Sequence, residues 1–567
     1  MKICIIHGYK LDGTGSNIYV RNIANELVLR GHDLSIMCQE RNADAIDFVN
    51  ELFFLDRNNE SLLLKAKKKT DFKGSCRVFI PDLNGKLLVY VYDRYDDFPE
   101  VLTFQEAEKE KILDYTDRNI KALMTIIKAF PPDIIHANHA IMQPYIVRRA
   151  TLDKKIPYIV TVHGSALNFS VRKSEFLHSF ALEGLVNSKI VTCVSEYNAR
   201  ELAQYFMLKG DKLEKKIKVL PVGIDINKFN IYSFKDVSDK KNNILKLTGL
   251  LREKIKLKDK GLDTGSKKAL NAYLDSISGI VPDESLINEY FNAHYSSYDA
   301  SSPDKDIKDI LASIDFIKKD IVLFTGKYLW TKGCQTLITA LPYIFKRSAD
   351  TEVIFIGFGQ SRAVFESLLY CLSKGYKDLF LFLAKRHFKI DPGSKADTPE
   401  ITKKFLERLE KQGILDDFFI KAKELDFYNK VHFTGIMSHD ELRYMTPLAD
   451  VFVAPSIFTE AFGTVAAEAL ACGVLPVITY DYGFKEVRDN IYKKLDEESL
   501  HKLPLPRLNE DFIDNLAKNI ISILDFHKRK DSDFRSKCHN IASSSYSWTG
   551  ITSEYENLYR YYLSNNF

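Results

Sequence analysis

The stretch 450–479 decides the fold, and its centre reads Glu460-Ala-Phe-Gly-Thr-Val-Ala-Ala-Glu468. The apolar run before it, Asp450-Val-Phe-Val-Ala-Pro-Ser456, predicts a buried strand. The small residues of 466–472 predict a short helix, and 474–479 predicts a second strand. Strand, loop, helix and strand form half of a nucleotide-binding α/β unit. In such units the ligand binds at the carboxyl ends of the strands, facing helix N-termini.

The two glutamates of this stretch are candidate ligand-binding residues. Glu460 is expected in the loop and Glu468 about one turn into the helix. One carboxylate could then accept hydrogen bonds from a sugar and the other from a ribose, with phosphate oxygens facing the backbone amides between them. Those amides belong to Phe462, Gly463 and Thr464. The alternative is that both glutamates are solvated helix residues.

The pattern Glu-Ala-Phe-Gly-x-Val-x-x-Glu-Ala-x-Ala-Cys-Gly-x-Pro-Val resembles the signature of the family 4 retaining glycosyltransferases. These are two-domain enzymes of the GT-B type, with two Rossmann-like, doubly wound α/β domains facing a cleft, and they use nucleotide-sugar donors. The resemblance implies that Glu460 contacts the donor sugar near the reacting centre and that Glu468 holds the ribose hydroxyls. It implies no cofactor beyond the UDP- or GDP-linked sugar, and no metal.

Two lysines follow the first strand of the second domain, in Gly326-Lys-Tyr-Leu-Trp-Thr-Lys-Gly333. Departure of a nucleoside diphosphate builds negative charge, so catalysis needs fixed positive charge at the leaving group. The segment resembles the family's diphosphate-binding motif, which implies that role for Lys332 and Lys327. Lys327 stands where the family commonly has arginine, which grips phosphate with a fork rather than a point charge. The alternative is two solvated loop lysines.

The first domain carries weaker signals. Gly13-Thr-Gly-Ser16 predicts a tight strand-to-helix turn in which Gly15 would let a diphosphate approach, or else an ordinary glycine turn. The resemblance places His163 near the donor sugar, although a lone histidine at a strand end is more often structural. His136 and His139 could line the acceptor side.

In the second domain, Phe433-Thr-Gly-Ile436 resembles the family segment whose backbone recognises the nucleobase. Ser438 is expected to cap a helix through Glu441.

Alternating strands and helices predict a parallel, doubly wound sheet in each half of the chain. The run Val78-Phe-Ile and the run 87–92, joined at Asn84-Gly85, predict an added β-hairpin. The predicted organisation is an N-terminal acceptor domain (1–228, hairpin about 72–104), a lysine-rich helical insertion (229–319), a nucleotide-sugar domain (320–500, insertion about 360–428) and C-terminal helices that cross back to the first domain (501–567).

Composition limits the remaining classes. A chain of 567 residues is too long for one core, and a net charge of +4 gives no reason to expect a nucleic-acid partner. The eight cysteines are scattered without a Cys-x-x-Cys pair, which favours buried, reduced thiols. The N-terminus has no signal-peptide layout and no run of 18 apolar residues occurs, so we expect a cytoplasmic protein.

A basic run between 250 and 268 could bind an anionic membrane surface or an acidic glycan. The protein would then contact the inner membrane face peripherally. The simpler interpretation is a solvated face.

The function predicted from these features is transfer of a sugar, with retention, from a nucleotide donor to a glycan, lipid or small-molecule acceptor. Departure and attack would occur on the same face of the sugar. Alternatives on the same fold are a nucleotide-sugar epimerase, a phosphorylase, which would need a lysine-bound pyridoxal phosphate, and a non-catalytic sugar- or nucleotide-binding homologue. A nicotinamide oxidoreductase is disfavoured because the glycine fingerprint is incomplete.

Overall fold

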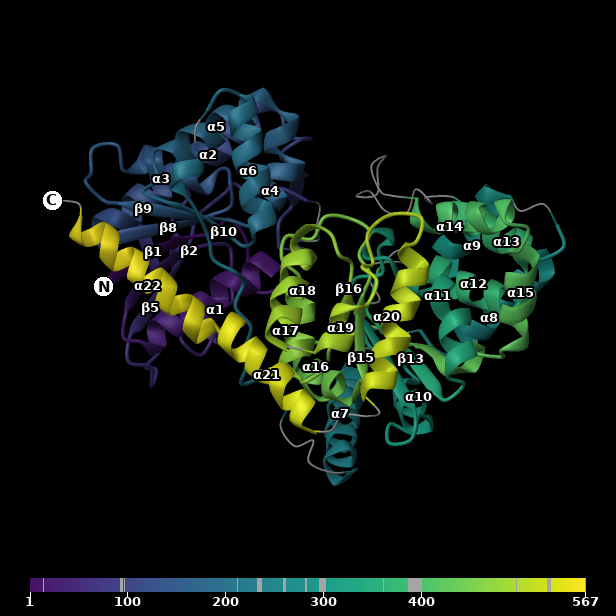
Figure 1. The fold of residues 1–567 in the computed structure, drawn as a ribbon. Coiled ribbons are helices and arrows are strands. Elements are labelled where there is room, and N and C mark those ends of the chain that lie inside the picture. The colour runs from purple at the N-terminus through teal and green to yellow at the C-terminus, as the bar shows by residue number, and fades with distance from the viewer. Residues whose placement is uncertain are drawn as a thin grey trace. The chain divides into compact units, whose positions relative to one another are not determined.

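The computed structural model divides the chain into two compact units, labelled along the chain in Figure 1. Unit 1 is Met1–Gly223 with Tyr546–Phe567, and unit 2 is Ile224–Ser545. The structure describes residues 1–567 except 14, 92–94, 96, 212, 232–236, 258–261, 281–282, 295–301, 360, 386–399, 496, 528–531 and 566–567.

Unit 1 is built on a nine-stranded sheet in the order β11-β10-β9-β8-β1-β2-β5-β3-β4. All neighbouring strands are parallel except the pair β3–β4. The strands are β1 (Lys2–Ile6), β2 (Asp33–Met37), β3 (Glu51–Leu55), β4 (Leu62–Lys67), β5 (Ser75–Ile80), β8 (Ile134–Asn138), β9 (Tyr158–Val162), β10 (Val191–Cys193) and β11 (Ile217–Val219).

The predicted hairpin at 72–104 is wrong. Asn84 and Gly85 do turn the chain, with φ of 52° and 73°. However, β5 lies inside the large sheet between β2 and β3. The following strand, β6 (Lys86–Val89), instead pairs in parallel with β7 (Glu100–Thr103) in a separate two-stranded sheet. The antiparallel pair of unit 1 is β3–β4, which the sequence analysis did not identify.

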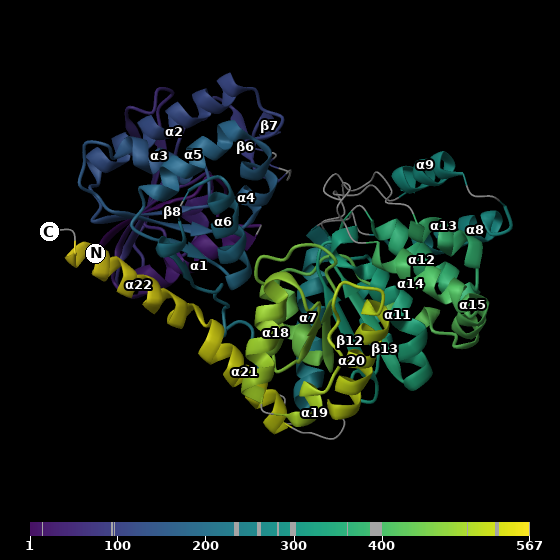
Figure 2. The ribbon, with the colours of Figure 1, turned by 45° about the horizontal axis from the view of Figure 1, so that its top comes forward.

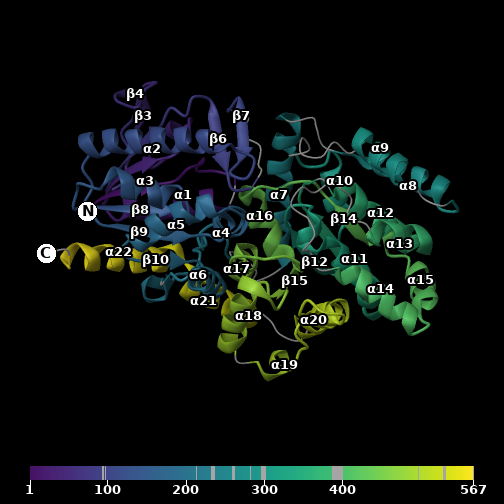
Figure 3. The same ribbon diagram turned by 90° about the horizontal axis from the view of Figure 1, so that it is seen from above.

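Helices cover both faces of the unit 1 sheet. Alternate side chains of β1 point to opposite faces, so they pack against different helices. Cys4 and Ile6 pack in a core cluster with α2 (Lys109–Ala129), α3 (Gln143–Ala150), α5 (Glu175–Val186) and α6 (Glu196–Leu208). Ile3 and Ile5 pack on the other side with α1 (Gly15–Leu29) and α22 (Trp548–Ser564). Figure 3 shows β8 and β9 between α2 and α22.

Unit 2 has a five-stranded, wholly parallel sheet in the order β14-β13-β12-β15-β16. The strands are β12 (Asp320–Thr325), β13 (Thr351–Ile356), β14 (Val431–Phe433), β15 (Val451–Ala454) and β16 (Pro476–Ile478). Helices α11 (Cys334–Arg347) and α20 (Phe512–His527) pack against one another beside this sheet, as Figure 2 shows. Apart from the half-buried Glu352, Thr325 and His432, these strands are buried on both faces, as parallel strands between helical layers must be.

The lysine-rich insertion is helical and belongs to unit 2. It contains α7 (Val237–Leu257), α8 (Thr264–Ile277), α9 (Glu284–His294) and α10 (Ile307–Ser313). Its basic run includes 258–260, which lie outside the described residues. Two lysines of the run are used within the unit. Lys254 contacts Glu441 at 3.0 Å, and Lys267 donates to the Phe433 carbonyl at 3.0 Å and contacts Asp304 at 3.3 Å.

The second insertion contributes the helices α12 (Arg362–Lys374), α13 (Lys377–Lys385), α14 (Ile401–Lys411) and α15 (Leu415–Glu424). The prediction that all of 501–567 crosses back to the first domain is too broad. Helices α20 and α21 (Ser532–Tyr546) lie in unit 2 up to Ser545, and only the segment that contains α22 belongs to unit 1. The junction after unit 1 comes at Gly223 rather than at 228.

The eight cysteines are all buried as free thiols, as predicted. Among the described residues, no helix combines the length and apolar character needed to cross a membrane.

Candidate active site

The strand order of unit 2 places a topological switch point between β12 and β15. The chain continues from β12 to β13 and β14 on one side, and from β15 to β16 on the other. In open parallel sheets, ligands bind in the crevice that this reversal opens at the carboxyl ends of the strands. The loops after β12 and β15 are therefore the expected walls of a nucleotide site.

These two loops touch each other closely. The amide of Ile457 donates to the Thr331 carbonyl at 2.9 Å. Gly333 has φ +75°, and a Cβ there would lie 1.9 Å from the Pro455 carbonyl oxygen. Only glycine allows this approach without displacing the β15 loop. The glycine that ends the predicted diphosphate segment thus fixes the distance between the two loops.

Lys332 and Glu460 meet across this contact, and their side chains form an ion pair through Nζ and Oε1. The Ser456 hydroxyl also donates to Glu460 Oε1, at 2.7 Å. Both charged groups are partly exposed, 34% for Lys332 and 20% for Glu460. The structure therefore brings two predicted catalytic residues to one point where solvent, or a ligand, can reach them.

Lys327 lies on the other side of β12. Its ammonium is 5.9 Å from the centre of the Phe358 ring, in the loop after β13. The two lysines of the segment thus flank the carboxyl end of β12, one toward β13 and one toward β15.

The loop after β15 ends in helix α17 (Thr464–Ala471). Its N-cap is Gly463, with φ +107°, where a Cβ would lie 2.3 Å from the Phe484 ring. The Phe462 side chain is buried, whereas Thr464 is partly exposed at the first helical position. The geometry thus has a helix N-terminus beside Glu460, which is the arrangement that favours an anion.

Glu468 lies one turn into α17, as predicted, and 13% of its side chain is exposed. Its Oε1 is 3.7 Å from His439 Nε2. Burial raises the pKa of Glu468 to about 8, and the charge of Asp225 adds to this, whereas Lys228 opposes it. At pH 7 the carboxyl group is thus mostly protonated.

We expect nucleoside diphosphate binding to release a proton from Glu468. Ribose hydroxyls donate more strongly to a carboxylate than to a carboxylic acid. A ribose bound at Glu468 would therefore lower the pKa of Glu468. Titrating UDP and GDP calorimetrically at pH 7, in buffers of different ionisation enthalpy, measures the proton count. Glu468→Gln should bind without this release, and an equal release from both proteins would contradict the assignment.

The same raised pKa affects folding. Glu468 stabilises the folded state only while it is protonated, so its contribution is complete below about pH 4.5 and is lost as the pH rises through 8.

The predicted base-recognition segment follows β14 and is engaged by the insertion. The Ile436 amide donates to the Ser302 carbonyl at 3.4 Å, and the Asp304 amide donates to the Thr434 carbonyl at 3.0 Å. The Asp304 carboxylate is buried and accepts two hydrogen bonds from Arg362, at 2.6 and 2.7 Å. The next element, α16 (His439–Met445), begins with the predicted capping box of Ser438 and Glu441.

In unit 1, Gly15 is the first residue of α1, and a Cβ there would meet nothing within 4 Å. His163 follows β9 and is held by Asn138, with 3.1 Å between Nε2 and Oδ1. Since the Asn138 amide nitrogen donates to the Ile6 carbonyl, its oxygen accepts from His163 Nε2, which leaves Nδ1 as an acceptor. Burial lowers the pKa of His163 to about 3, so this ring is neutral at pH 7.

The two other histidines predicted for the acceptor side differ. His136 has both ring nitrogens bonded inside unit 1, to the Tyr559 hydroxyl at 2.8 Å and to the Thr161 hydroxyl at 2.7 Å. It therefore fastens α22 to the sheet. His139 lies beyond the end of β8 in a cluster of aromatic rings that includes His7, Tyr9, Tyr90 and His163.

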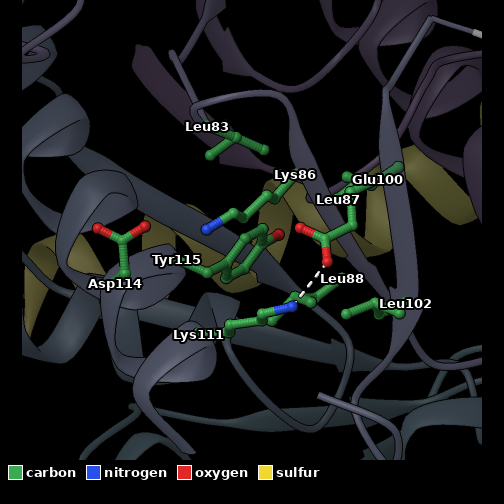
Figure 4. A pocket seen from close by; sticks show the side chains of 9 residues that line it. All are labelled: Leu83, Lys86, Leu87, Leu88, Glu100, Leu102, Lys111, Asp114 and Tyr115. Carbon is green, nitrogen blue, oxygen red and sulfur yellow. Dashed lines mark hydrogen bonds and ion pairs between the residues drawn. The ribbon is translucent and has the colours of Figure 1, made fainter. Parts of the chain in front are cut away.

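A small hollow between β6, β7 and α2 lies elsewhere in unit 1 (Figure 4). Two lysines and two acidic residues line it, and Lys111 bonds Glu100 across it at 2.7 Å. The formal charges of its lining residues therefore sum to zero.

Three residues near the unit 2 site were missed by the sequence analysis. Ser456 orients Glu460, His439 faces Glu468, and Asp225 helps to raise the pKa of Glu468. Ser456 could have been identified from the sequence, because it ends the predicted strand and lies four residues before Glu460. His439 and Asp225 come from segments far from Glu468 in the sequence, so their proximity to Glu468 could not be read from local pattern. In the described part of the chain, no group of three or more His, Cys, Asp and Glu could hold a metal ion.

Comparisons with known families agree with this architecture. The family described as Glycosyltransferase Family 4 matches residues 76–228, and Glycosyl transferases group 1 matches residues 416–494. The second range contains Glu460, α17 and Glu468. The first contains β8, β9 and His163.

Two curated relatives are similar over part of the chain. The gpi3 subunit of phosphatidylinositol N-acetylglucosaminyltransferase from Schizosaccharomyces pombe is 31% identical over 24% of this chain and 27% of its own length. An uncharacterised glycosyltransferase of Methanocaldococcus jannaschii is 25% identical over 30% of this chain and 29% of its own length. The chain therefore matches less than a third of the length of each relative.

The fold is similar to that of a solved GT-B protein, sucrose-phosphate synthase from Thermosynechococcus elongatus. The comparison has a TM-score of 0.53, with 15% identity, and covers 99% of both chains. Both units thus match family models of glycosyltransferases, and the two Rossmann-like units have the GT-B fold.

Proposed function

We propose that this protein transfers a sugar from a nucleoside-diphosphate sugar to an acceptor hydroxyl, with retention of configuration. The observation that carries the proposal is the Lys332–Glu460 pair at the switch point of unit 2. A cation for the leaving diphosphate and a carboxylate for the sugar hydroxyls stand together there, beside the N-terminus of α17. Glu468, one turn further, is suited to the ribose.

The proposed chemistry is a same-face displacement. The bond between the anomeric carbon and the diphosphate oxygen breaks, and the oxygen leaves with the electron pair. The acceptor oxygen forms the new bond on the same face, and its proton passes to the departing phosphate. Lys332 and the amides at Gly463 and Thr464 would stabilise the growing negative charge. His163, being neutral, would contribute a hydrogen bond rather than a charge.

The donor would bind unit 2, and a glycan, lipid or small-molecule acceptor would bind unit 1. The fission-yeast relative is named for phosphatidylinositol, which supports a lipid among these classes. An epimerase would also hold a nucleotide sugar at the same site, and a non-catalytic homologue would also bind it. The Lys332–Glu460 pair beside a helix N-terminus supports an enzyme over a non-catalytic homologue, because a fixed cation there would stabilise a departing diphosphate.

A thermal-shift screen of UDP, GDP, ADP and their glucose, N-acetylglucosamine and mannose conjugates tests the proposal. A ligand at one hundred times its Kd should stabilise the protein by about 2.7 kcal/mol. The conjugate that stabilises the protein is then incubated with it alone. Release of free sugar supports a transferase, appearance of an epimeric nucleotide sugar supports an epimerase, and stabilisation without turnover supports a binding homologue. If no nucleotide stabilises the chain, the proposal fails.

A further inference from the structure

Two cations and two carboxylates form a cluster inside unit 2. The guanidinium of Arg362, the first residue of α12, donates to both carboxylate oxygens of Asp304 and, at 3.0 Å, to Glu366. Lys267 of α8 completes the cluster, 3.3 Å from Asp304. The Arg362 and Asp304 side chains are only 6% and 1% exposed. All four residues come from the two insertions of unit 2 and lie outside the ranges that the family models match.

The backbone of Asp304 is bonded to the loop that follows β14. The Asp304 amide donates to the Thr434 carbonyl at 3.0 Å, and Pro303 forms an isolated antiparallel bridge with Gly435. Gly435 has φ +73°, and a Cβ there would lie 2.8 Å from the Asp304 nitrogen. Only glycine allows the first insertion to approach the loop this closely. The side chain that Arg362 holds therefore belongs to the residue that fixes the position of 434–436.

The loops after β12, β13 and β14 are also joined to one another at the carboxyl end of the sheet. The Gly357 amide donates to the Gly435 carbonyl at 3.0 Å, and the Tyr328 amide donates to the Phe358 carbonyl at 2.6 Å. The Tyr328 ring is buried, and its centre lies 6.0 Å from the Arg362 guanidinium carbon. Arg362 therefore lies against the loop after β12 and, through its ion pair, holds the loop after β14.

The energetics of such a pair point to geometry rather than to stability. Removing two charges from water costs about as much free energy as their attraction returns, and apolar side chains of similar volume often stabilise a protein equally well. A guanidinium, however, presents two parallel N–H groups to a carboxylate in one fixed orientation. The bidentate contact of Arg362 with Asp304 therefore defines where the Asp304 backbone lies.

We propose that Arg362 and Asp304 are positioning residues through which the two insertions set the affinity of unit 2 for the nucleoside part of the donor. The inference rests on the proposed transferase function and deepens it. Ligands of open parallel sheets bind at the carboxyl ends of the strands, and residues 434–436 stand there after β14. Arg362 and Asp304 act through this loop and are assigned no contact with the donor.

The groups proposed for the diphosphate are held by other contacts. Lys332 pairs with Glu460 on the β15 side of β12, where the Ile457 amide donates to the Thr331 carbonyl. The N-terminus of α17 lies on the same side. Loss of the Arg362 pair should therefore weaken the binding of a nucleoside diphosphate but not of inorganic pyrophosphate, which lacks the base and the ribose.

The test compares Asp304→Asn with a matched control, Asp450→Asn, in the full chain. Asp450 also pairs with a buried arginine, Arg535, at 3.5 Å, but it precedes β15, at the amino end of the sheet. Both variants keep the side-chain shape and lose the charge, so both should lower the melting temperature. Calorimetric titration with UDP, GDP, ADP and inorganic pyrophosphate measures Kd. Asp304→Asn should weaken binding of the preferred nucleoside diphosphate about tenfold and leave pyrophosphate unchanged, whereas Asp450→Asn should change neither.

Turnover gives a second readout. With the nucleotide sugar found by the thermal-shift screen, Asp304→Asn should raise the donor KM about tenfold and leave kcat nearly unchanged. Lys267→Met removes a partly exposed member of the cluster and gives a milder variant, which should shift the donor KM in the same direction even if Asp304→Asn does not fold.

Two results would overturn the inference. One is a wild-type affinity for the nucleoside diphosphate in both Asp304→Asn and Lys267→Met. The other is a loss of pyrophosphate binding as large as the loss of nucleoside diphosphate binding, because the pair would then support the whole unit rather than one loop. The proposed function fails separately, if the wild type neither binds nor hydrolyses any nucleotide sugar.

Discussion

Replacing Lys332 by alanine is expected to lower kcat by about 10²–10³, the range found when one preorganised stabilising group is removed. The negative charge of the leaving diphosphate grows as the glycosidic bond lengthens, so a fixed ammonium gains attraction along the reaction. The donor KM should change much less, because the helix α17 amides and Lys327 still hold the ground state. Steady-state kinetics with the donor found by the screen measure both parameters.

Lys327→Ala is the matched control, because it removes the other lysine of the segment, which lies against Phe358 on the opposite side of β12. Its effect on kcat should be smaller than that of Lys332→Ala. Lys332→Arg should recover part of the rate, limited by the bulk of the guanidinium. A large rise in KM for Lys332→Ala with kcat intact would mean that Lys332 binds the ground state and transition state equally.

Truncating the chain after Tyr546, which removes α22, is expected to unfold unit 1. The helix buries Trp548, Ile551, Tyr555, Leu558 and Tyr559 on the sheet. Each such side chain contributes about 1.5–3 kcal/mol, and together they approach the whole stability of a typical domain, about 5–15 kcal/mol. The truncation also leaves His136 Nδ1 buried without its partner.

Hydrogen exchange followed by mass spectrometry can separate the two units. In the truncated chain, peptides from β1, β8 and β9 should lose protection, whereas peptides from β12 and β15 should keep it. Tyr559→Phe provides a mild version, which removes one buried hydrogen bond and should cost about 1–3 kcal/mol. Full protection of β8 in the truncated chain would show that α22 is dispensable to unit 1.

Local pattern sufficed where neighbouring residues determine the structure. The strand–loop–helix of 450–471 and the capping box at Ser438 were both predicted from short segments. The prediction of a hairpin was wrong because Asn84-Gly85 indicates only a turn, not which strands pair. Whether β5 pairs with the strand after that turn, or enters a sheet between β2 and β3, depends on side chains far away in sequence.

The chemistry of single groups was less predictable than their position. Glu468 was placed correctly in its helix, but its raised pKa arises from burial and from Asp225, which lies in another segment. His139 looked like one of two similar histidines three residues apart. The structure gives His136 two partners and gives His139 none among the described residues, a difference that only the packing around each ring determines.

The arrangement of α22 also has a consequence for biosynthesis. Tyr555 and Tyr559 bond to Thr161, Thr192 and His136 in the middle of the unit 1 sheet, yet all of unit 2 is translated between those strands and that helix. Ribosomes need on the order of 20–60 s for such a segment. Throughout that interval one face of the emerging N-terminal sheet is covered by α1 but lacks α22. Unit 2 therefore has time to fold before the N-terminal sheet receives the helix that completes it.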